Sequence, residues 1–209
     1  SRQAICTRLA NPQRSPHPSS YPQRQQTLEA VLRLAARPPG MTTVTGFPPI
    51  ANRHAIILIL GSMPSIKSLQ EKQYYAHPRN SFWPILITLL AGKADLDYEQ
   101  RKSLLLENRI ALWDVLNTCQ RKGSLDSSIN NETTIVNDFN TFFKNHPGIK
   151  AVYFNGALAQ QEYHKQVLPK LDKKFASIEH KRLPSTSPAM ASLTREQKLR
   201  QWAVILQYL

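Results

Sequence analysis

The sequence predicts an α/β protein, a three-layer α/β/α sandwich around a central, mainly parallel four-stranded sheet. From residue 51 onwards, short apolar runs alternate with longer segments of helical character. The first run, residues 55–60 (AIILIL), is continuously apolar, as parallel strands are when helices cover both faces of their sheet. Helices between the strands also favour parallel pairing, because each crossover returns the chain to the same edge of the sheet.

The elements follow one another along the chain as strand and helix. We expect strands at residues 55–60, 110–115 (IALWDV), 151–154 (AVYF) and 178–183. Helices are expected at residues 81–90, 98–108, 133–145, 156–167 and 194–208, with a polar loop from residue 116 through 131. Residues 146–148 (HPG) close the third helix, and Thr194 is the expected cap of the last one, with Glu196 in its first turn.

The chain is strongly basic, with 27 Lys and Arg residues against 14 Asp and Glu, a net charge of +13. Such a field attracts polyanions, of which nucleic acid is the commonest, although solubility or a basic tail would also account for it. Residues 1–40 hold six arginines, many prolines and one acid, whereas residues 41–209 hold 21 bases and 13 acids and still carry +8. The charge therefore belongs to the predicted domain as well as to the leading segment.

We divide the chain into a basic Pro/Arg-rich extension, residues 1–40, and a single domain, residues 41–209. The extension is expected to be disordered or non-native, with Met41 as the natural start; an organelle transit segment is the alternative. Residues 28–36 (LEAVLRLAA) fit a short helix in either case. The two cysteines, Cys6 and Cys119, suggest a reducing, intracellular location, and no apolar run approaches the ~20 residues of a membrane helix.

Small, polar or proline residues follow each predicted strand. They are residues 61–65 (GSMPS), Asp114, residues 155–156 (NG) and residues 184–189 (PSTSPA). Because ligands bind beyond the carboxyl ends of parallel strands, these four segments together describe a site. The sequence has no G-x-G-x-x-G, no G-K-[ST], no G-x-S-x-G and no metal-binding His pair, so dinucleotide, nucleoside triphosphate and serine-hydrolase chemistry lose their main support.

These segments resemble the motifs of the uracil-DNA glycosylase superfamily. Residues 61–65 resemble its first signature, and residues 183–189 (LPSTSPA) its second, the loop that enters the minor groove. Residues 75–83 (YAHPRNSFW) look like the segment that follows the first signature in the mismatch-specific uracil/thymine branch. Together with residues 110–116 and 151–156, the set most resembles the hypoxanthine-DNA glycosylase branch, over about residues 46–208.

The resemblance implies an enzyme that flips a deaminated base out of DNA and hydrolyses its N-glycosidic bond. Hypoxanthine is the expected base, with uracil or xanthine as secondary substrates. No lysine stands in the four strand-end motifs, which predicts a monofunctional glycosylase, since a lyase needs a Schiff base. No metal or organic cofactor is implied, and we expect an intracellular monomer acting on double-stranded DNA that contains a damaged base.

The resemblance also assigns residues. Met63 stands where many members of the superfamily place an Asp or Asn that positions water, and Asn80 and Asn155 match the asparagines that the hypoxanthine branch is thought to use. We therefore expect Asn80 and Asn155 to be catalytic. The expected base-binding residues are Ser62, Met63, Tyr75 and Asp114, and the expected DNA-binding residues are Ser65, His77, Ser185, Ser187, Ala189 and Met190.

Structural roles remain open for the same side chains. Asn80 suits a helix cap, Asn155 a turn, Asp114 a loop cap or an arginine partner, and Met190 a packing residue under the last helix. Two other functions also remain open. One is a catalytically inactive nucleic-acid-binding module of the same fold, and the other is a small-molecule hydrolase with Ser62 or Ser65 as nucleophile.

Overall fold

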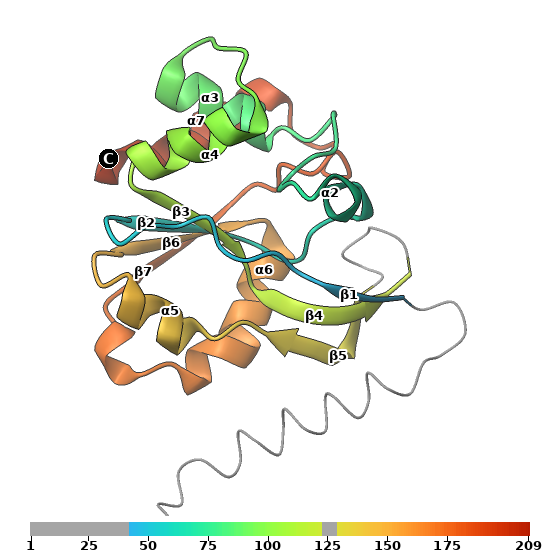
Figure 1. The fold of residues 1–209 in the computed structure, drawn as a ribbon, viewed down its shortest axis with the longest axis vertical. Coiled ribbons are helices and arrows are strands. Elements are labelled where there is room, and N and C mark those ends of the chain that lie inside the picture. Colours follow the sequence, from blue (N-terminus) through green and yellow to red (C-terminus); the bar gives the residue numbers. More distant parts are fainter. Residues whose placement is uncertain (1–41, 123–128) are drawn as a thin grey trace, which may run out of the picture.

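A parallel sheet of four strands forms the centre of the molecule. The computed structural model describes residues 42–122 and 129–209, so the expectations for residues 1–40, Met41 and the 28–36 helix lie outside the described residues. The strands are β2 (Ile57–Gly61), β3 (Ile110–Asp114), β6 (Ala151–Asn155) and β7 (Glu179–Leu183), in the spatial order β3-β2-β6-β7 (Figure 1). The predicted fold class is confirmed.

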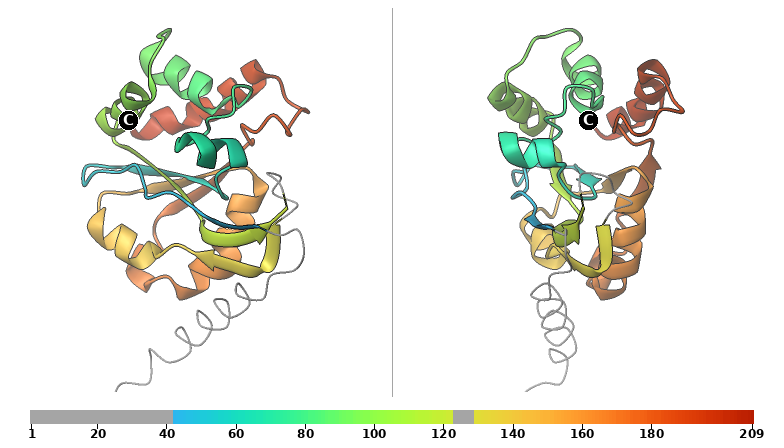
Figure 2. Two further views of the ribbon diagram at one scale, coloured as in Figure 1. Left: turned by 45° about the vertical axis from the view of Figure 1, so that its right-hand side comes forward. Right: turned by 90° about the vertical axis from the view of Figure 1, so that its right-hand side faces the viewer.

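Helices cover both faces of this sheet, as Figures 1 and 2 show. On one face lie α3 (Phe82–Ala91), α4 (Tyr98–Glu107) and α7 (Arg195–Trp202); on the other lie α5 (Phe139–Asn145) and α6 (Ala157–Glu162). Strand β2 is buried throughout, and its alternate side chains enter two separate cores: Ile57 and Ile59 pack with the α3 and α7 side, Leu58 and Leu60 with the α5 and α6 side. This double burial explains why the strand is continuously apolar.

The sequence prediction is wrong at residues 116–121 and 129–138, whereas residues 123–128 of the expected loop lie outside the described residues. Instead of a polar loop and a helix from residue 133, the chain forms β4 (Leu116–Arg121) and β5 (Ile129–Val136), which join β1 (Thr42–Thr45) in an antiparallel sheet ordered β1-β4-β5. The run 133–136 (TTIV) is β-branched throughout and so favours a strand. Helix α5 begins only after Asp138, whose carboxylate caps it by accepting a hydrogen bond from the Thr141 amide at 3.0 Å.

Several helices are shorter than expected, and one was missed. Helix α2 (Ile66–Glu71) directly follows the first signature, with Ser65 as its cap. The segment expected as one helix at 156–167 is α6 followed by a π-helical turn, Tyr163–Val167, and two 3₁₀ turns follow at Leu168–Lys170 and Lys173–Phe175. The last helix, α7, ends at Trp202 and continues as a 3₁₀ turn, Ala203–Tyr208; its predicted cap Thr194 is confirmed. Among the described residues no helix is both long and apolar enough to cross a membrane.

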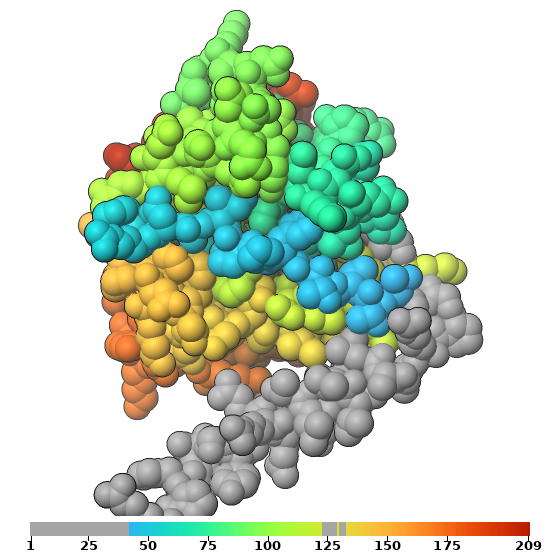
Figure 3. Space-filling view, viewed as in Figure 1, coloured from blue at the N-terminus to red at the C-terminus, as the bar shows by residue number. Residues whose placement is uncertain are grey.

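The segment before β2 covers one edge of the sheet. Figure 3 shows it as a band across the surface between α4 and α5. Within it, Ile50 pairs with Leu112 of β3 through two backbone hydrogen bonds of 2.9 and 2.8 Å. At the opposite edge, β7 exposes Lys181 and Arg182, and edge charges of this kind oppose pairing with another chain. Both edges of the sheet are thus protected.

His180 of β7 packs among aromatic rings on the α6 side of the sheet. Its ring centroid lies 5.2 Å from that of Tyr163, 5.6 Å from His164 and 5.8 Å from Phe154. Its Nε2 is buried without a hydrogen-bond partner in the described part of the chain. Burial lowers the pKa of His180, and the neighbouring His164 lowers it further. The folded protein therefore holds this imidazole in its neutral form.

This burial makes stability depend on pH. An unfolded histidine has a pKa of about 6.5, so below that pH the unfolded chain binds more protons and stability is lost as the pH falls towards the folded pKa. We expect the free energy of unfolding, measured with urea, to fall between about pH 7.5 and about pH 5.5, and to fall less in His180→Phe, which has no such proton to bind. Identical pH dependence in the two proteins would contradict the assignment.

Candidate active site

A pocket of about 460 Å³ lies at the carboxyl edge of the parallel sheet, with all four strand-end segments in its walls. Of the twelve site residues expected from sequence, eleven line it. They are Ser62, Met63, Ser65, Tyr75, Asn80, Asp114, Asn155, Ser185, Ser187, Ala189 and Met190. The structure thus brings together side chains separated by more than a hundred positions in the sequence.

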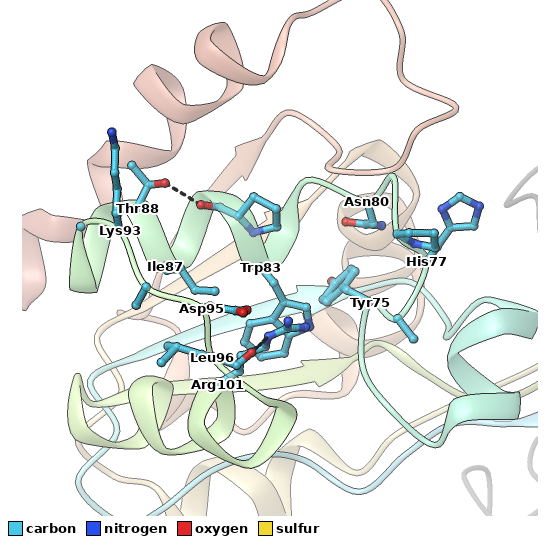
Figure 4. Close-up of a pocket in the computed structure, with 15 residues that line it drawn as sticks. Tyr75, His77, Asn80, Trp83, Ile87, Thr88, Lys93, Asp95, Leu96 and Arg101 are labelled. Carbon is cyan, nitrogen blue, oxygen red and sulfur yellow. Dashed lines mark hydrogen bonds between the residues drawn. The ribbon is translucent and has the colours of Figure 1, made fainter.

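His77 is the expected residue that does not line this pocket. It borders a neighbouring cavity of about 650 Å³, whose walls include Trp83 and Arg101. Figure 4 shows Tyr75, His77 and Asn80 close together at one end of that cavity and Lys93 at the other. Tyr75 and Asn80 line both cavities and so form the wall between them.

The absence of a side chain at Gly61 lets two polar groups approach the backbone. A Cβ on this residue would lie 2.3 Å from Asp114 Oδ1 and 2.8 Å from Tyr75 Oη, both closer than non-bonded atoms can come. Asp114 is only 3% exposed, and its carbonyl accepts a 2.8 Å hydrogen bond from Asn137 Nδ2. The carboxylate and the phenol hydroxyl are therefore held side by side at the end of β2, within the pocket lining.

Tyr75 adopts an uncommon backbone conformation. Its φ of 55° lies in the left-handed region, which bulky residues rarely occupy and which occurs more often at functional sites. One face of its ring stacks on Phe82, with centroids 4.0 Å apart and planes at 21°. Phe82 itself is completely buried and belongs to the core, whereas Tyr75 lines the pocket, as does the neighbouring Tyr74.

The two asparagines differ in how much of each amide is already bonded. Asn80 Oδ1 accepts from the Phe82 amide at 2.9 Å, whereas its Nδ2 makes no hydrogen bond within the described residues. Asn155 uses both ends on Thr186: its Nδ2 donates to Thr186 Oγ1, and its Oδ1 accepts from the Thr186 amide, each at 2.9 Å. The cap of α3 is Ser81, which makes no side-chain capping bond, so Asn80 is not the helix cap; its side chain closes a turn just before the helix. The side-chain bonds of Asn155 are not local either, because they join β6 to the second signature.

Thr186 is a residue that the sequence argument missed. It is completely buried, holds Asn155, and its carbonyl accepts from the Ser81 amide at 3.0 Å, next to Asn80. It therefore links the second signature to β6 and to the start of α3. Its position between Ser185 and Ser187, in the middle of the 184–189 motif, is the sequence signal for such a role.

Arg121 is a second residue that the sequence did not indicate. It is 1% exposed at the end of β4 and donates a hydrogen bond to the carbonyl of Pro64, in the first signature. The same signature is held from the junction of β3 and β4, where the amides of Val115 and Leu116 donate to the carbonyls of Gly61 and Ser62 at 2.9 and 3.0 Å. No signal pointed to Arg121, because its strand was expected to be a loop.

Among the described residues, the polar side chains that line the pocket are one carboxylate, amides, hydroxyls and the phenols of Tyr74 and Tyr75. No histidine is among the described residues that line it. The described residues also contain no group of three or more His, Cys, Asp or Glu side chains able to hold a metal ion. Such a site can position a ligand and a water molecule by hydrogen bonding.

Comparison with known proteins identifies the family. The model of the uracil DNA glycosylase superfamily matches residues 48–209. A hypoxanthine DNA glycosylase of Methanosarcina acetivorans is 35% identical over 164 residues, which span 78% of this chain and 98% of that protein. A hypoxanthine DNA glycosylase of Methanosarcina barkeri is 38% identical over 112 residues, 53% of this chain and 70% of that protein.

A solved structure is also similar. It is the solution NMR structure of a Methanosarcina acetivorans protein described as a candidate uracil DNA glycosylase, with a TM-score of 0.66 and 32% identity over 79% of this chain and 98% of that one. The residues matched by the family model, 48–209, include the parallel sheet and the four segments that form the pocket. The chain belongs to the uracil DNA glycosylase superfamily.

Proposed function

We propose that this protein is a monofunctional DNA N-glycosylase that takes a deaminated base, hypoxanthine in the first place, into the pocket at the sheet edge. Uracil and xanthine are the secondary substrates. The observation that carries the proposal is the convergence of all four strand-end motifs on one pocket in a chain that is 35% identical to a hypoxanthine DNA glycosylase. The enzyme would act as a monomer on double-stranded DNA.

Recognition of the base is assigned to the group around Gly61. A flipped hypoxanthine carries an N1–H donor next to its O6 acceptor, and the buried carboxylate of Asp114 can accept that N1–H. Tyr75 supports the base with the part of its side chain that faces the pocket. Uracil also presents an N–H beside a carbonyl, which explains why it would be a secondary substrate.

Asn80 is assigned to the chemistry itself. Cleavage of the glycosidic bond passes through an oxocarbenium-like state and needs a stabilised leaving group and a placed water molecule. The Asn80 Nδ2, which is not bonded within the described residues, can donate to either of them, although an amide cannot remove a proton. Asn155 would contribute in two ways. Its second Nδ2 hydrogen and the second lone pair of its Oδ1, which Thr186 does not use, could contact the ligand, and its bonds to Thr186 hold the second signature in place.

We assign the contacts with the DNA backbone to residues at the rim of the pocket. Ser65, Ser185 and Ser187 offer small hydroxyl groups next to backbone amides, a combination that suits phosphate contacts. His77 lies beside the pocket and would contact the same strand. Ala189 and Met190 form the apolar part of the rim, from which a side chain can fill the gap left by a flipped nucleotide.

The function can be tested with a duplex oligonucleotide that contains one deoxyinosine. Release of hypoxanthine leaves an abasic site, which alkali converts to a strand break, and a parallel panel with deoxyuridine and deoxyxanthosine ranks the bases. We expect strand breaks to depend on alkali, because a monofunctional glycosylase does not cut the backbone itself. A protein that binds the duplex and never produces breaks would instead be an inactive binding module.

The two asparagines give the first mutational prediction. Asn80→Ala and Asn155→Ala should each lower the single-turnover rate of hypoxanthine release by about 10- to 1,000-fold, roughly 1.4–4 kcal/mol of transition-state stabilisation. Affinity for DNA should change little, because phosphate contacts supply most of it. Circular dichroism must show that each variant is folded.

Thr186→Val serves as the control for the two mechanisms proposed for Asn155. This change removes the hydroxyl that Asn155 Nδ2 donates to and keeps the side-chain volume. If Asn155 acts by holding the second signature, Thr186→Val should reproduce most of the loss seen in Asn155→Ala. Folded Asn80→Ala and Asn155→Ala proteins that both work at the parent rate would show that the assignment is wrong, and Asp114 would become the leading candidate.

Met190 gives the second prediction. The residue is 38% exposed and lines the pocket. Met190→Ala should slow release of hypoxanthine from duplex DNA more than from a single strand, because unpairing and unstacking cost a few kcal/mol and only the duplex bears that cost in full. Equal losses on the two substrates would exclude a role in filling the duplex.

A further inference from the structure

Residues 187–190 form a turn at the rim of the pocket, here called the rim turn. The Met190 amide donates to the Ser187 carbonyl at 3.0 Å and closes it. The Ala189 amide donates to Ser187 Oγ at 3.2 Å inside it. These two hydrogen bonds fix the shape of the turn. They do not fix where the turn lies relative to the pocket, which depends on contacts with other elements.

Lys198 of α7 holds the rim turn at both ends. Its Nζ donates to the Met190 carbonyl at 2.9 Å and to the Ser187 carbonyl at 3.4 Å. An ammonium group has three donors, which allows one lysine to bind the first and the last carbonyl of the same turn. Lys198 is only 3% exposed, although it lies on a helix whose other charged residues face solvent.

The burial of Lys198 is costly for the fold. In the described part of the chain no carboxylate lies within ion-pair distance of it, whereas Arg200 on the same helix pairs with exposed Glu196 at 2.6 Å. A buried ammonium without a counter-charge loses solvation, and burial accordingly lowers the pKa of Lys198. The two carbonyls that Lys198 binds replace part of the lost solvation.

The same helix also holds the start of the second signature. Trp202 is completely buried, and its Nε1 donates to the Pro184 carbonyl at 3.0 Å. Lys198 and Trp202 are four residues apart and therefore lie on one face of α7. Between their attachment points, Asn155 holds Thr186 from β6. Of these three anchors, Lys198 is the one that acts on the exposed, Met190-bearing end of the loop.

We propose that Lys198 is a positioning residue, which fixes the rim turn so that Met190 stands ready to enter the space left by a flipped nucleotide. The inference rests on the proposed glycosylase function and concerns the flipping step rather than bond cleavage. A loose rim turn would have to be ordered each time a base is flipped from a duplex, and the free energy of ordering it would add to that of unstacking the base. On a single strand the base is already unpaired, so no gap in a duplex has to be filled and this ordering is not needed.

The test compares release of hypoxanthine from duplex and single-stranded deoxyinosine oligonucleotides under single-turnover conditions. For Lys198→Met we expect a loss of about ten-fold or more on the duplex and of no more than about three-fold on the single strand. The fluorescence of a 2-aminopurine next to the deoxyinosine, which rises when the base stack opens, should increase less in this variant than in the parent. Lys198→Arg, which keeps a charged donor, should recover part of the duplex rate.

Arg200→Met is the matched control. It removes a positive charge from the same helix, at an exposed position that holds no carbonyl of the rim turn, and should leave the ratio of the two rates unchanged. Circular dichroism and thermal unfolding check the fold; should Lys198→Met not fold, Lys198→Gln, which keeps one amide donor, takes its place in the same comparison. Parent-like rates, or equal losses on both substrates with parent-like fluorescence, would overturn the inference. The same experiment distinguishes failure of the proposed glycosylase function from failure of this inference. If the function is wrong, the parent protein itself releases no hypoxanthine from either substrate.

Discussion

The burial of β2 on both faces is the constraint on which the rest of this structure depends. A strand whose five residues are all buried needs a layer on each side, and its alternate side chains supply two cores of different composition. Its neighbours β3 and β6 run parallel to it, so all three carboxyl ends lie at one edge of the sheet. The segments that follow these strands therefore meet at one edge of the sheet, and the pocket lies between them.

Polar side chains then decide the shape of the site. Arg121 reaches the first signature from the second sheet, Asn155 reaches the second signature from β6, and Lys198 and Trp202 reach it from α7. Each of these groups is buried or half-buried and is bonded to another element of the chain. In surroundings of low polarity an unmade hydrogen bond is costly, so contacts of this kind specify one arrangement of the loops and hold the pocket ready for its ligand.

The site is equipped for positioning more than for proton transfer. Met63, in the first signature, is 7% exposed and packs into the core below the pocket, so this position supplies bulk rather than a ligand for water. In the proposed function the polar contacts come from Asp114, from the Asn80 Nδ2, which is not bonded within the described residues, and from Tyr75, whose backbone is strained beside Gly61. Such a site fits a reaction in which the leaving base is stabilised by donors in fixed positions.

The sequence by itself determined the four parallel strands and the segments that follow them, because continuous apolar runs and the residues at their ends are local features of the chain. It did not reveal β1, β4 and β5. Strand β1 pairs with β4 between residues 73 to 79 positions apart, from Thr45 with Thr118 to Thr42 with Arg121, and the sheet buries polar residues such as Gln120 and Arg121. Thr186 and Lys198 were also missed. A lysine in an amphipathic helix is ordinarily solvated, and the partner of Thr186, Asn155, is 31 positions away in the sequence. Only the tertiary structure decided that these polar groups turn inward, because their partners come from distant segments of the chain.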